Sequence, residues 1–307
     1  MRIAVTGATG FIGPYMLRGF LDAGHEVVAL ARPGREEAVF QPETGDRKVE
    51  VFTGDLTVEG SLDGFLKGVD VLMHMAACHD HVDDETMQKV TVQGTEFLLQ
   101  EAEKNSPEMK FWVMSSAVIG APVYSYYRDA KRVQEKLIKG RDFDWVSFRP
   151  TLVYGVGDYR HTAPLLRRCA QQGGSMWIPH KGNSKINPVH VEDVVKAVIA
   201  YFDFDRGIDC MYELAGPSGL TYNDFIDLTI EATGGTIKRR NISRKWIDRA
   251  LFFVGLFKDT TKYRRASAYF TLHHEHDISN AVHELDWQPR TYAEGIREVA
   301  QGDWWRE

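Results

Sequence analysis

The most constraining feature of the sequence is a glycine-rich segment between an apolar run and a helical pattern. Residues 3–6 have the character of a buried strand, and residues from about 12 to 23 have the apolar spacing of a helix. Between them the chain reads Thr6-Gly7-Ala8-Thr9-Gly10-Phe11-Ile12-Gly13. A strand, a turn with three glycines and a helix, in that order, are typical of a βαβ unit that binds a dinucleotide.

Each glycine of this segment has its own expected role. Gly7 allows the tight turn, Gly10 lets backbone amides approach a pyrophosphate, and Gly13 allows the helix to pack closely on the strand. The phosphates would then lie at the N-terminus of the helix, which favours anions. We therefore predict that the cofactor contacts Gly7, Thr9, Gly10, Phe11, Ile12 and Gly13.

The end of the second predicted strand indicates which dinucleotide binds. In NAD-selective sites an acidic residue there binds the ribose 2′-hydroxyl. Here residues 27–31 are followed by Arg32, with Arg35 nearby, and no carboxylate stands at the strand end. A guanidinium suits a 2′-phosphate, so we predict a preference for NADP(H) over NAD(H). The alternative is that Arg32 is a surface residue at the entrance of a loop.

Apolar runs alternate with helical patterns over the first half of the chain, which predicts a doubly wound, Rossmann-type α/β fold with a parallel sheet. After Pro150 the pattern loosens, and glycine-rich turns separate short elements. We expect an NADP-binding Rossmann domain at residues 1–150 and about 187–212, and a smaller, mixed substrate-binding region at about 151–186 and 213–307. The further strands are expected at residues 49–53, 69–74, 111–115 and 145–149, and the further helices near 58–67, 86–104 and 127–139.

The net charge of −6 argues against nucleic acid as a partner. Three widely spaced cysteines predict neither disulfides nor a metal site, and with no export leader in the sequence they favour the cytoplasm. The longest apolar stretch, residues 250–257, is too short to span a bilayer. The histidine-rich stretches at 78–81 and 273–276 lack zinc-ligand spacing, so we expect solvated loops and no metal.

Several motifs in a fixed order resemble the extended short-chain dehydrogenase/reductase family, also called the NAD-dependent epimerase/dehydratase family. The resemblance implies a sheet of about seven parallel strands and a C-terminal region that closes over the substrate. It also implies that Asp55 and Leu56 lie beside the adenine, that Ala76 and Ala77 line the nucleotide and that Pro150 contacts the cofactor. Members of the family commonly form homodimers, so a homodimer is possible. The motifs are the glycine turn, Gly54-Asp55-Leu56, His74-Met75-Ala76-Ala77, Ser115-Ser116, Tyr127-Arg128-Asp129-Ala130-Lys131, Arg149-Pro150 with Tyr154-Gly155, Pro188-Val189-His190 with Asp193, and Leu285-Asp286-Trp287 with Pro289.

Tyr127 and Lys131 are four residues apart in a predicted helix, so their side chains share one face. A neighbouring ammonium and an oxidised nicotinamide favour the phenolate of a tyrosine, which lets Tyr127 exchange a proton with a carbonyl or alcohol. Lys131 and Tyr127 would also contact the cofactor. The alternative is a half-buried tyrosine under a lysine with no catalytic role. Tyr124 and Tyr126 lie nearby, but neither has a lysine four residues on.

Ser115 is expected to hydrogen-bond the reacting oxygen. It lies five residues before Gly120, which matches the position of the catalytic Ser or Thr in the resembling family, and we prefer it to Ser116. Two departures from the family pattern affect the reaction: Thr91 stands where asparagine is usual, and Leu152 stands where sugar-nucleotide enzymes usually have asparagine. The segment from Ser115 to Tyr127 is also short for a sugar-nucleotide enzyme.

These features leave three functions open. The first is an NADP(H)-dependent oxidoreductase that interconverts a carbonyl and a secondary alcohol. The second is a nucleotide-sugar epimerase or dehydratase with transient internal oxidation, and the third is a non-catalytic NADP-binding subunit, against which Tyr127 and Lys131 argue together. Residues 246–257 are rich in aromatic side chains and form either a lipophilic lid or a buried amphipathic core helix.

Overall fold

The computed structural model describes the chain except residues 41–47, 79–82, 205–208, 256–259, 261–275 and 307. It divides into two compact units. The first comprises Met1–Pro150, Val194–Leu214 and Ser279–Trp287, and the second comprises Thr151–Asp193, Ala215–Ile278 and Gln288–Glu307. Which unit binds the cofactor and which the substrate stays a prediction.

The first unit is built on a seven-stranded sheet in which every pairing is parallel. The strand order is β11-β6-β5-β4-β1-β2-β3, so the chain reverses its winding direction between β1 and β4. This confirms the predicted doubly wound Rossmann-type fold, and it adds β11, which the apolar pattern did not reveal. The strands are β1 (Arg2–Thr6), β2 (Glu26–Ala31), β3 (Glu50–Thr53), β4 (Val71–His74), β5 (Lys110–Met114), β6 (Trp145–Pro150) and β11 (Cys210–Leu214).

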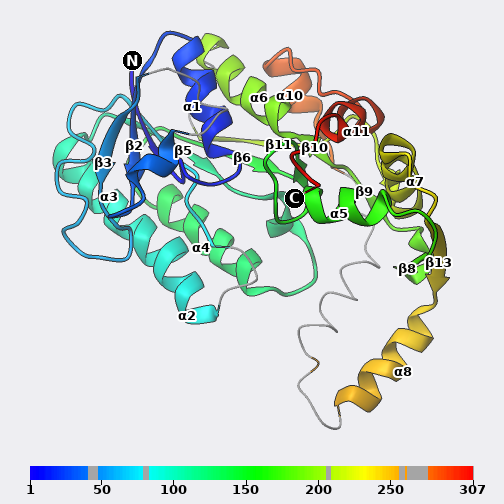
Figure 1. Ribbon diagram of the computed structural model, residues 1–307. Helices are drawn as coiled ribbons and strands as arrows, with labels where there is room; N and C mark the ends of the chain where they lie inside the picture. The colour runs from blue at the N-terminus through cyan, green and yellow to red at the C-terminus, as the bar shows by residue number, and fades with distance from the viewer. Residues whose placement is uncertain (41–47, 79–82, 205–208, 256–259, 261–275, 307) are drawn as a thin grey trace. The chain divides into compact units, whose positions relative to one another are not determined.

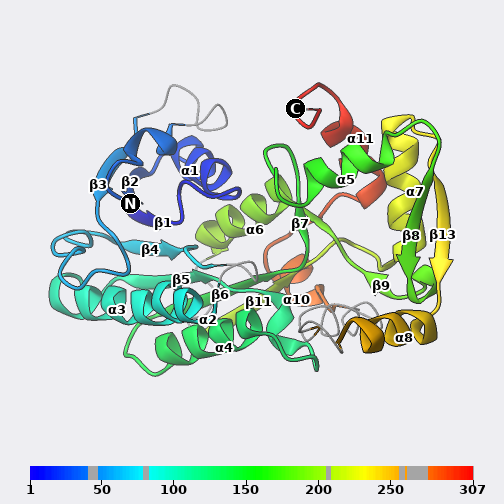
Figure 2. The ribbon, with the colours of Figure 1, turned by 60° about the horizontal axis from the view of Figure 1, so that its bottom comes forward.

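Helices cover both faces of this sheet (Figures 1 and 2). α1 (Gly13–Asp22) and α6 (Val191–Phe204) lie on one face, and α3 (Gly94–Asn105) and α4 (Tyr126–Lys139) lie on the other. The side chains of β5 alternate accordingly: Trp112 contacts Tyr201 and Phe202 of α6, whereas Phe111 and Val113 join the core on the α3 face. The shorter elements are the 3-10 turns Glu36–Val39 and Ala117–Gly120, α2 (Asp84–Met87) and α10 (Ser279–Glu284).

The crossover between β3 and β4 is not the helix that we predicted near residues 58–67. It is a series of turns, in which Gly60, Gly64 and Gly68 have φ values of 76°, 87° and 69°. Left-handed glycines at every fourth position interrupt the helical hydrogen-bond ladder, and the N–H groups bond to carbonyls three residues back instead. Leu62, Phe65 and Leu66 are still buried. The apolar spacing therefore predicted correctly which side chains are buried, but the helical backbone that it also predicted does not form.

The predicted helix at residues 86–104 forms, but its first half is irregular. Residues Gln88–Gln93 adopt a π-helix between α2 and α3. Such wide turns disturb the regular pairing of carbonyls and are frequent at functional sites. Thr91 lies in the middle of this segment and is fully buried.

The second unit is a mixed region of short elements around a core that includes Tyr154, Phe225 and Tyr292. Thr221 and Thr291 begin two of its helices with complete capping boxes. Its strands pair as β10 with β7, β12 with β9 and β13 with β8. The elements are β7 (Val153–Tyr154), α5 (Thr162–Cys169), β8 (Ser175–Pro179), a 3-10 turn (His180–Gly182), β9 (Lys185–Ile186), β10 (Val189–His190), β12 (Leu220–Thr221), α7 (Tyr222–Thr233), β13 (Lys238–Ile242), α8 (Arg244–Gly255) and α11 (Tyr292–Ala300).

The aromatic stretch that begins at Trp246 forms most of α8. Trp246, Phe252 and Phe253 are 63%, 57% and 64% exposed, so a buried core helix is the wrong interpretation for these side chains. The role of a lid stays a prediction. The end of the stretch, Phe257, lies outside the described residues, as do four histidines of the two histidine-rich stretches, His79, His81, His273 and His274. No helix within the described ranges is long and apolar enough to cross a bilayer.

Candidate cofactor and active site

The glycine turn follows β1 at the point where the winding of the sheet reverses, and β4 is its neighbour there. Gly7 has a φ of 78°, and a Cβ atom at this position would lie 2.8 Å from the backbone nitrogen of Ala76. A side chain on Gly13 would collide with the carbonyl of Ala8. Both glycines are therefore required by the packing of the backbone itself.

Gly10 differs from its two neighbours in the motif. It is exposed, and among the described residues a Cβ added here would approach only the carbonyl oxygen of Gly7, at 3.3 Å. The turn is held by hydrogen bonds from Gly10 N to Gly7 O and from Gly13 N to Gly10 O, at 3.0 and 3.2 Å. The missing side chain at Gly10 would let a phosphate approach the backbone closely, as the motif predicts.

The N-terminus of α1 is suited to an anion. Ile12 is its N-cap residue and provides no side-chain hydrogen bond, and the first turn carries no acidic residue. The first turn of the helix is thus not capped by the side chain of its N-cap residue, and its N–H groups favour an anion. Phe11 and Ile12 are half-buried beside this helix end, and Phe11 packs edge-on against Tyr15 at 6.2 Å between ring centres. The residues of the turn therefore fit a dinucleotide pyrophosphate.

Arg32 follows β2 directly and begins a tight turn. The N–H of Arg35 donates to the carbonyl of Arg32 at 2.9 Å, with Pro33 and Gly34, at φ 75°, between them. Both arginine side chains are exposed. Glu36, which follows Arg35 in the sequence, accepts a hydrogen bond from Thr53 Oγ1 at 3.1 Å. The end of β2 thus offers two guanidinium groups to a ligand.

The other predicted cofactor residues follow the carboxyl ends of neighbouring strands. Asp55, after β3, caps a turn by accepting bonds from the N–H and hydroxyl of Thr57, both at 2.8 Å, and Leu56 is buried against Gly94. Ala76 and Ala77 follow β4 and are half-buried. Pro150 is the buried last residue of β6. The fold thus places these residues at the carboxyl-terminal ends of the sheet strands, while their contacts with a cofactor stay a prediction.

Tyr127 and Lys131 both lie in α4, as the spacing predicted. Ser125 caps the helix by accepting a bond from Arg128 N at 3.0 Å. Arg128 Nη1 in turn donates to the carbonyls of Ala121 and Val123 at 3.0 and 2.9 Å, which fixes the loop before the helix. Tyr127 is half-buried, whereas the neighbouring Tyr124 and Tyr126 are 37% and 43% exposed.

Lys131 is fully enclosed, with 2% of its surface exposed. Its Nζ donates to the main-chain carbonyl of Met114, at the end of β5, at 2.8 Å and to Gln134 Oε1 at 2.9 Å. Burial lowers the pKa of Lys131 to about 7, although the carboxylate of Glu135 opposes the shift. Lys131 is therefore an ammonium whose charge is readily lost near neutral pH.

Ser115 follows β5 and is 3% exposed, and its N–H donates to the carbonyl of Phe148 at 2.7 Å. Its Oγ is buried and makes no well-formed hydrogen bond to a described residue. Glu135 is close enough for this hydroxyl to stabilise the carboxylate. Ser115 thus lies at the same sheet edge as the carbonyl that holds Lys131.

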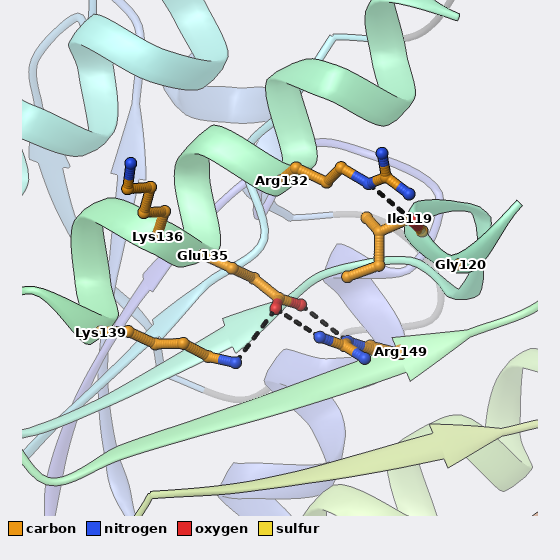
Figure 3. A pocket seen from close by; sticks show the side chains of 7 residues that line it. All are labelled: Ile119, Gly120, Arg132, Glu135, Lys136, Lys139 and Arg149. Atoms are coloured by element: carbon orange, nitrogen blue, oxygen red, sulfur yellow. Dashed lines mark hydrogen bonds and ion pairs between the residues drawn. The ribbon is translucent and has the colours of Figure 1, made fainter. Parts of the chain in front are cut away.

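Glu135 forms ion pairs with Arg149 and Lys139 (Figure 3). Arg149 donates two hydrogen bonds to the Glu135 carboxylate, from Nε at 2.9 Å and from Nη2 at 2.6 Å. Ser147 Oγ donates a third to the same carboxylate at 2.7 Å. Burial alone would raise the pKa of Glu135, but the hydrogen bonds from Arg149 and Ser147, together with the nearby hydroxyl of Ser115, lower it to about 2. The pair lines a hollow of about 370 Å³ together with Arg132 and Lys139. In Figure 3 Lys136 points away from the ion pair, so the basic side chains around this hollow do not converge on one point.

The sequence interpretation missed the polar groups beneath Lys131. Gln134 and His74 are both fully buried, and Gln134 Nε2 lies 3.0 Å from His74 Nε2. Helical periodicity contained a signal for Gln134, because residues 127, 131, 134 and 138 share one face of α4 and a glutamine is out of place on a buried stripe. No comparable signal marked the role of His74.

Comparison with known proteins agrees with the fold. The model of the NAD dependent epimerase/dehydratase family matches residues 3–213. The ceramide reductase of Caulobacter vibrioides is 30% identical over 200 residues, which are 65% of this chain and 60% of that protein. The chain thus spans less than two thirds of the length of this relative.

Two solved structures resemble nearly the whole chain. The structure of gox2253 has a TM-score of 0.81 and 23% identity, and the match covers 99% of this chain and 97% of the other. A UDP-glucose 4-epimerase of Thermotoga maritima, solved with UDP-glucose, has a TM-score of 0.76 and 18% identity over 100% and 99% of the two chains. Since the family model also covers more than half of the sequence, the protein belongs to the NAD-dependent epimerase/dehydratase family of extended short-chain dehydrogenases/reductases.

Proposed function

We propose that the protein is an NADP(H)-dependent oxidoreductase that interconverts a carbonyl and a secondary alcohol. The observation that carries this proposal is the position of Lys131: its ammonium is buried on the same helix as Tyr127 and bonded to the carboxyl end of β5, beside Ser115. Burying a lysine costs free energy of folding, and ionisable groups with strongly shifted pKa values cluster at functional sites. A buried lysine with a lowered pKa, close to a tyrosine, is suited to proton transfer.

In the proposed reduction, a bound NADPH supplies the hydride to the carbonyl carbon. Tyr127 donates its phenolic proton to the carbonyl oxygen, which becomes the hydroxyl of the product. The charge of Lys131 stabilises the phenolate that remains, and Ser115 Oγ donates a hydrogen bond to the reacting oxygen. In the oxidation each of these residues acts in the reverse sense.

The preference for NADP(H) rests on the Arg32 turn. Arg32 and Arg35 are exposed at the end of β2, where NAD-selective sites carry an acidic residue. Two guanidinium groups fit the 2′-phosphate of NADP(H), and Glu36 is engaged with Thr53.

A nucleotide-sugar epimerase or dehydratase is the second candidate. The observation that favours it is the TM-score of 0.76 to a UDP-glucose 4-epimerase over nearly the full length of both chains. The similarity to a ceramide reductase and the Arg32 turn favour net reduction. Small-molecule ketones are therefore the first substrate class to test, and sugar nucleotides are the second.

One experiment separates these functions. The purified protein is mixed with NADPH or NADH and either a panel of ketones, including an oxidised ceramide, or UDP-glucose. A reductase oxidises NADPH in proportion to the ketone consumed, whereas an epimerase converts UDP-glucose without net oxidation of the cofactor. Binding of NADPH without turnover of any compound would instead support a non-catalytic binding subunit.

A further inference from the structure

Gln134 lies directly beneath Lys131 and is completely buried. It comes three residues later in α4, so both side chains project from the same face of the helix. Gln134 Oε1 accepts a hydrogen bond from Lys131 Nζ at 2.9 Å. With the bond to the carbonyl of Met114, two of the three N–H groups of the ammonium have fixed partners.

The amide of Gln134 is held in one orientation. Its Nε2 lies 3.0 Å from Thr95 Oγ1 and 3.4 Å from the main-chain carbonyl of Thr91. A carbonyl only accepts, and the hydroxyl of Thr95 already donates its proton to Thr91 O at 2.7 Å. Both groups therefore require the NH₂ end of the amide on their side, which leaves Oε1 for Lys131.

The π-helix makes this arrangement available. Thr91 lies within Gln88–Gln93, where the wide turn breaks the regular helical ladder, and its carbonyl faces the amide of Gln134 and the hydroxyl of Thr95. Thr91 also accepts a bond from Cys78 N through its own hydroxyl, at 3.2 Å. The π-helix thus supplies the carbonyl that orients the amide of Gln134.

The network continues to the strands that flank the glycine turn. His74 Nε2 lies 2.9 Å from Thr95 Oγ1, which also accepts from Gln134 Nε2, and His74 Nδ1 lies 2.6 Å from Thr6 Oγ1. Thr6 Oγ1 accepts the N–H of Ala76 at 3.2 Å. Burial, followed by the charge of Lys131, lowers the pKa of His74 to about 3, so the ring is neutral around pH 7. Lys131 is thereby tied to the ends of β1 and β4.

We propose that Gln134 is a positioning residue for Lys131, which fixes the ammonium in its catalytic orientation and stabilises its charge through Oε1. The inference rests on the proposed role of Lys131 in proton transfer. An amide does not gain or lose a proton near neutral pH, so Gln134 anchors the ammonium without connecting it to a proton pathway. The titratable groups around Lys131 are Tyr127 and Glu135 on the same helix and the neutral His74 on β4.

The proposal is tested without a substrate by measuring the titration of Lys131. The full-length protein is labelled with [ε-¹³C]lysine, the Lys131 signal is assigned with Lys131→Met, and its midpoint is followed by NMR against pH. Gln134→Leu removes the acceptor and is expected to lower the midpoint by about one pH unit, while Gln134→Glu adds a carboxylate and is expected to raise it by about one unit or more. Lys136→Gln, an exposed change on the same helix, is the control and should leave the midpoint in place.

Opposite shifts in the two variants establish the coupling, because loosened packing would not move the midpoint in both directions. Unchanged midpoints, or shifts of the same sign, overturn the proposal. Gln134→Glu has nearly the size of the native residue, so it decides the question even where Gln134→Leu does not fold. A failure to reduce any ketone would overturn the proposed function and leave this titration intact. Once a substrate is found, the alkaline limb of the pH profile of kcat/KM is expected to move with the Lys131 midpoint in both variants.

Discussion

A Cβ atom on Gly7 would lie 2.8 Å from the backbone nitrogen of Ala76, so the glycine turn after β1 and the segment after β4 are in direct contact. These two segments flank the point where the strand order reverses, which is where α/β sheets of this kind bind their ligands. The contact leaves no room for a side chain, and the φ of 78° is unfavourable for any residue with one.

We therefore expect Gly7→Ala to destabilise the first unit and to weaken NADPH binding together. Strain of this kind costs on the order of 1 to 3 kcal/mol. Urea unfolding and NADPH fluorescence titration measure the two effects. Gly120→Ala is the matched control, because no atom of the described residues lies within 4 Å of its added Cβ. Equal stability of the two variants would contradict the packing argument.

Arg32→Asp is expected to weaken NADPH binding by about 10- to 100-fold and NADH binding much less. The reason is the loss of a charge-assisted hydrogen bond to the 2′-phosphate and the introduction of a repulsive carboxylate. Binding of both cofactors by calorimetry tests this, with Lys67→Asp as a control at an exposed site of the same unit. An equal loss of affinity for NADPH and NADH would refute the role of Arg32 in cofactor selection.

Tyr127→Phe is expected to lower the turnover of an identified carbonyl substrate by about 100- to 10,000-fold, because the proton donor is removed while the ring remains. The effect on NADPH affinity should be much smaller. Tyr126→Phe removes a hydroxyl from the adjacent, exposed tyrosine and should leave turnover near the native value. The assignment of Tyr127 fails if its variant keeps full turnover.

The stability of the protein is expected to fall as the pH drops from about 6.5, partly because of His74. Its pKa is 6.5 when unfolded and about 3 in the fold, so in this window the unfolded chain binds the extra proton. The contribution is complete above pH 6.5 and declines by at most about 1.4 kcal/mol per pH unit below it.

Unfolding by urea between pH 7.5 and 5, above the range where Glu135 titrates, measures this slope. His74→Gln should be less stable at pH 7.5 and should depend less on pH. His283→Gln changes an exposed histidine and should retain the native slope. If His74→Gln and the native protein show the same slope, the buried neutral state of His74 does not contribute.

The sequence predicted the parts of the fold that local pattern determines. Gly7, Gly10 and Gly13 marked the βαβ unit because their backbone demands are local, and the spacing of Tyr127 and Lys131 placed both on α4. The crossover at residues 58–67 was predicted wrongly because apolar periodicity reports which side chains are buried, while the glycines set the backbone. Trp246 was ambiguous for a related reason: an apolar helix face reads the same whether or not another element covers it.

The polar network around Lys131 could not be predicted from the sequence, for a different reason. Thr6, His74 and Gln134 are 60 or more positions apart where they meet, and only the strand order of the sheet brings them together. Glu135 could have been found from its place one turn after Lys131, but its partner Arg149 comes from β6. Contacts of this kind depend on tertiary structure and leave no periodic trace in the chain.

The turns between β3 and β4 have a consequence for how this part of the molecule opens. Their amides are held by isolated bonds to carbonyls three residues back, while Leu62, Phe65 and Leu66 anchor the segment to the sheet. Such a segment has no cooperative series of helical hydrogen bonds. Each amide proton can therefore exchange with solvent on its own while the buried side chains stay in place. Hydrogen exchange at residues 58–69 should therefore be fast and independent of global unfolding, next to the very residues, Asp55 and Leu56, that are expected to border the adenine.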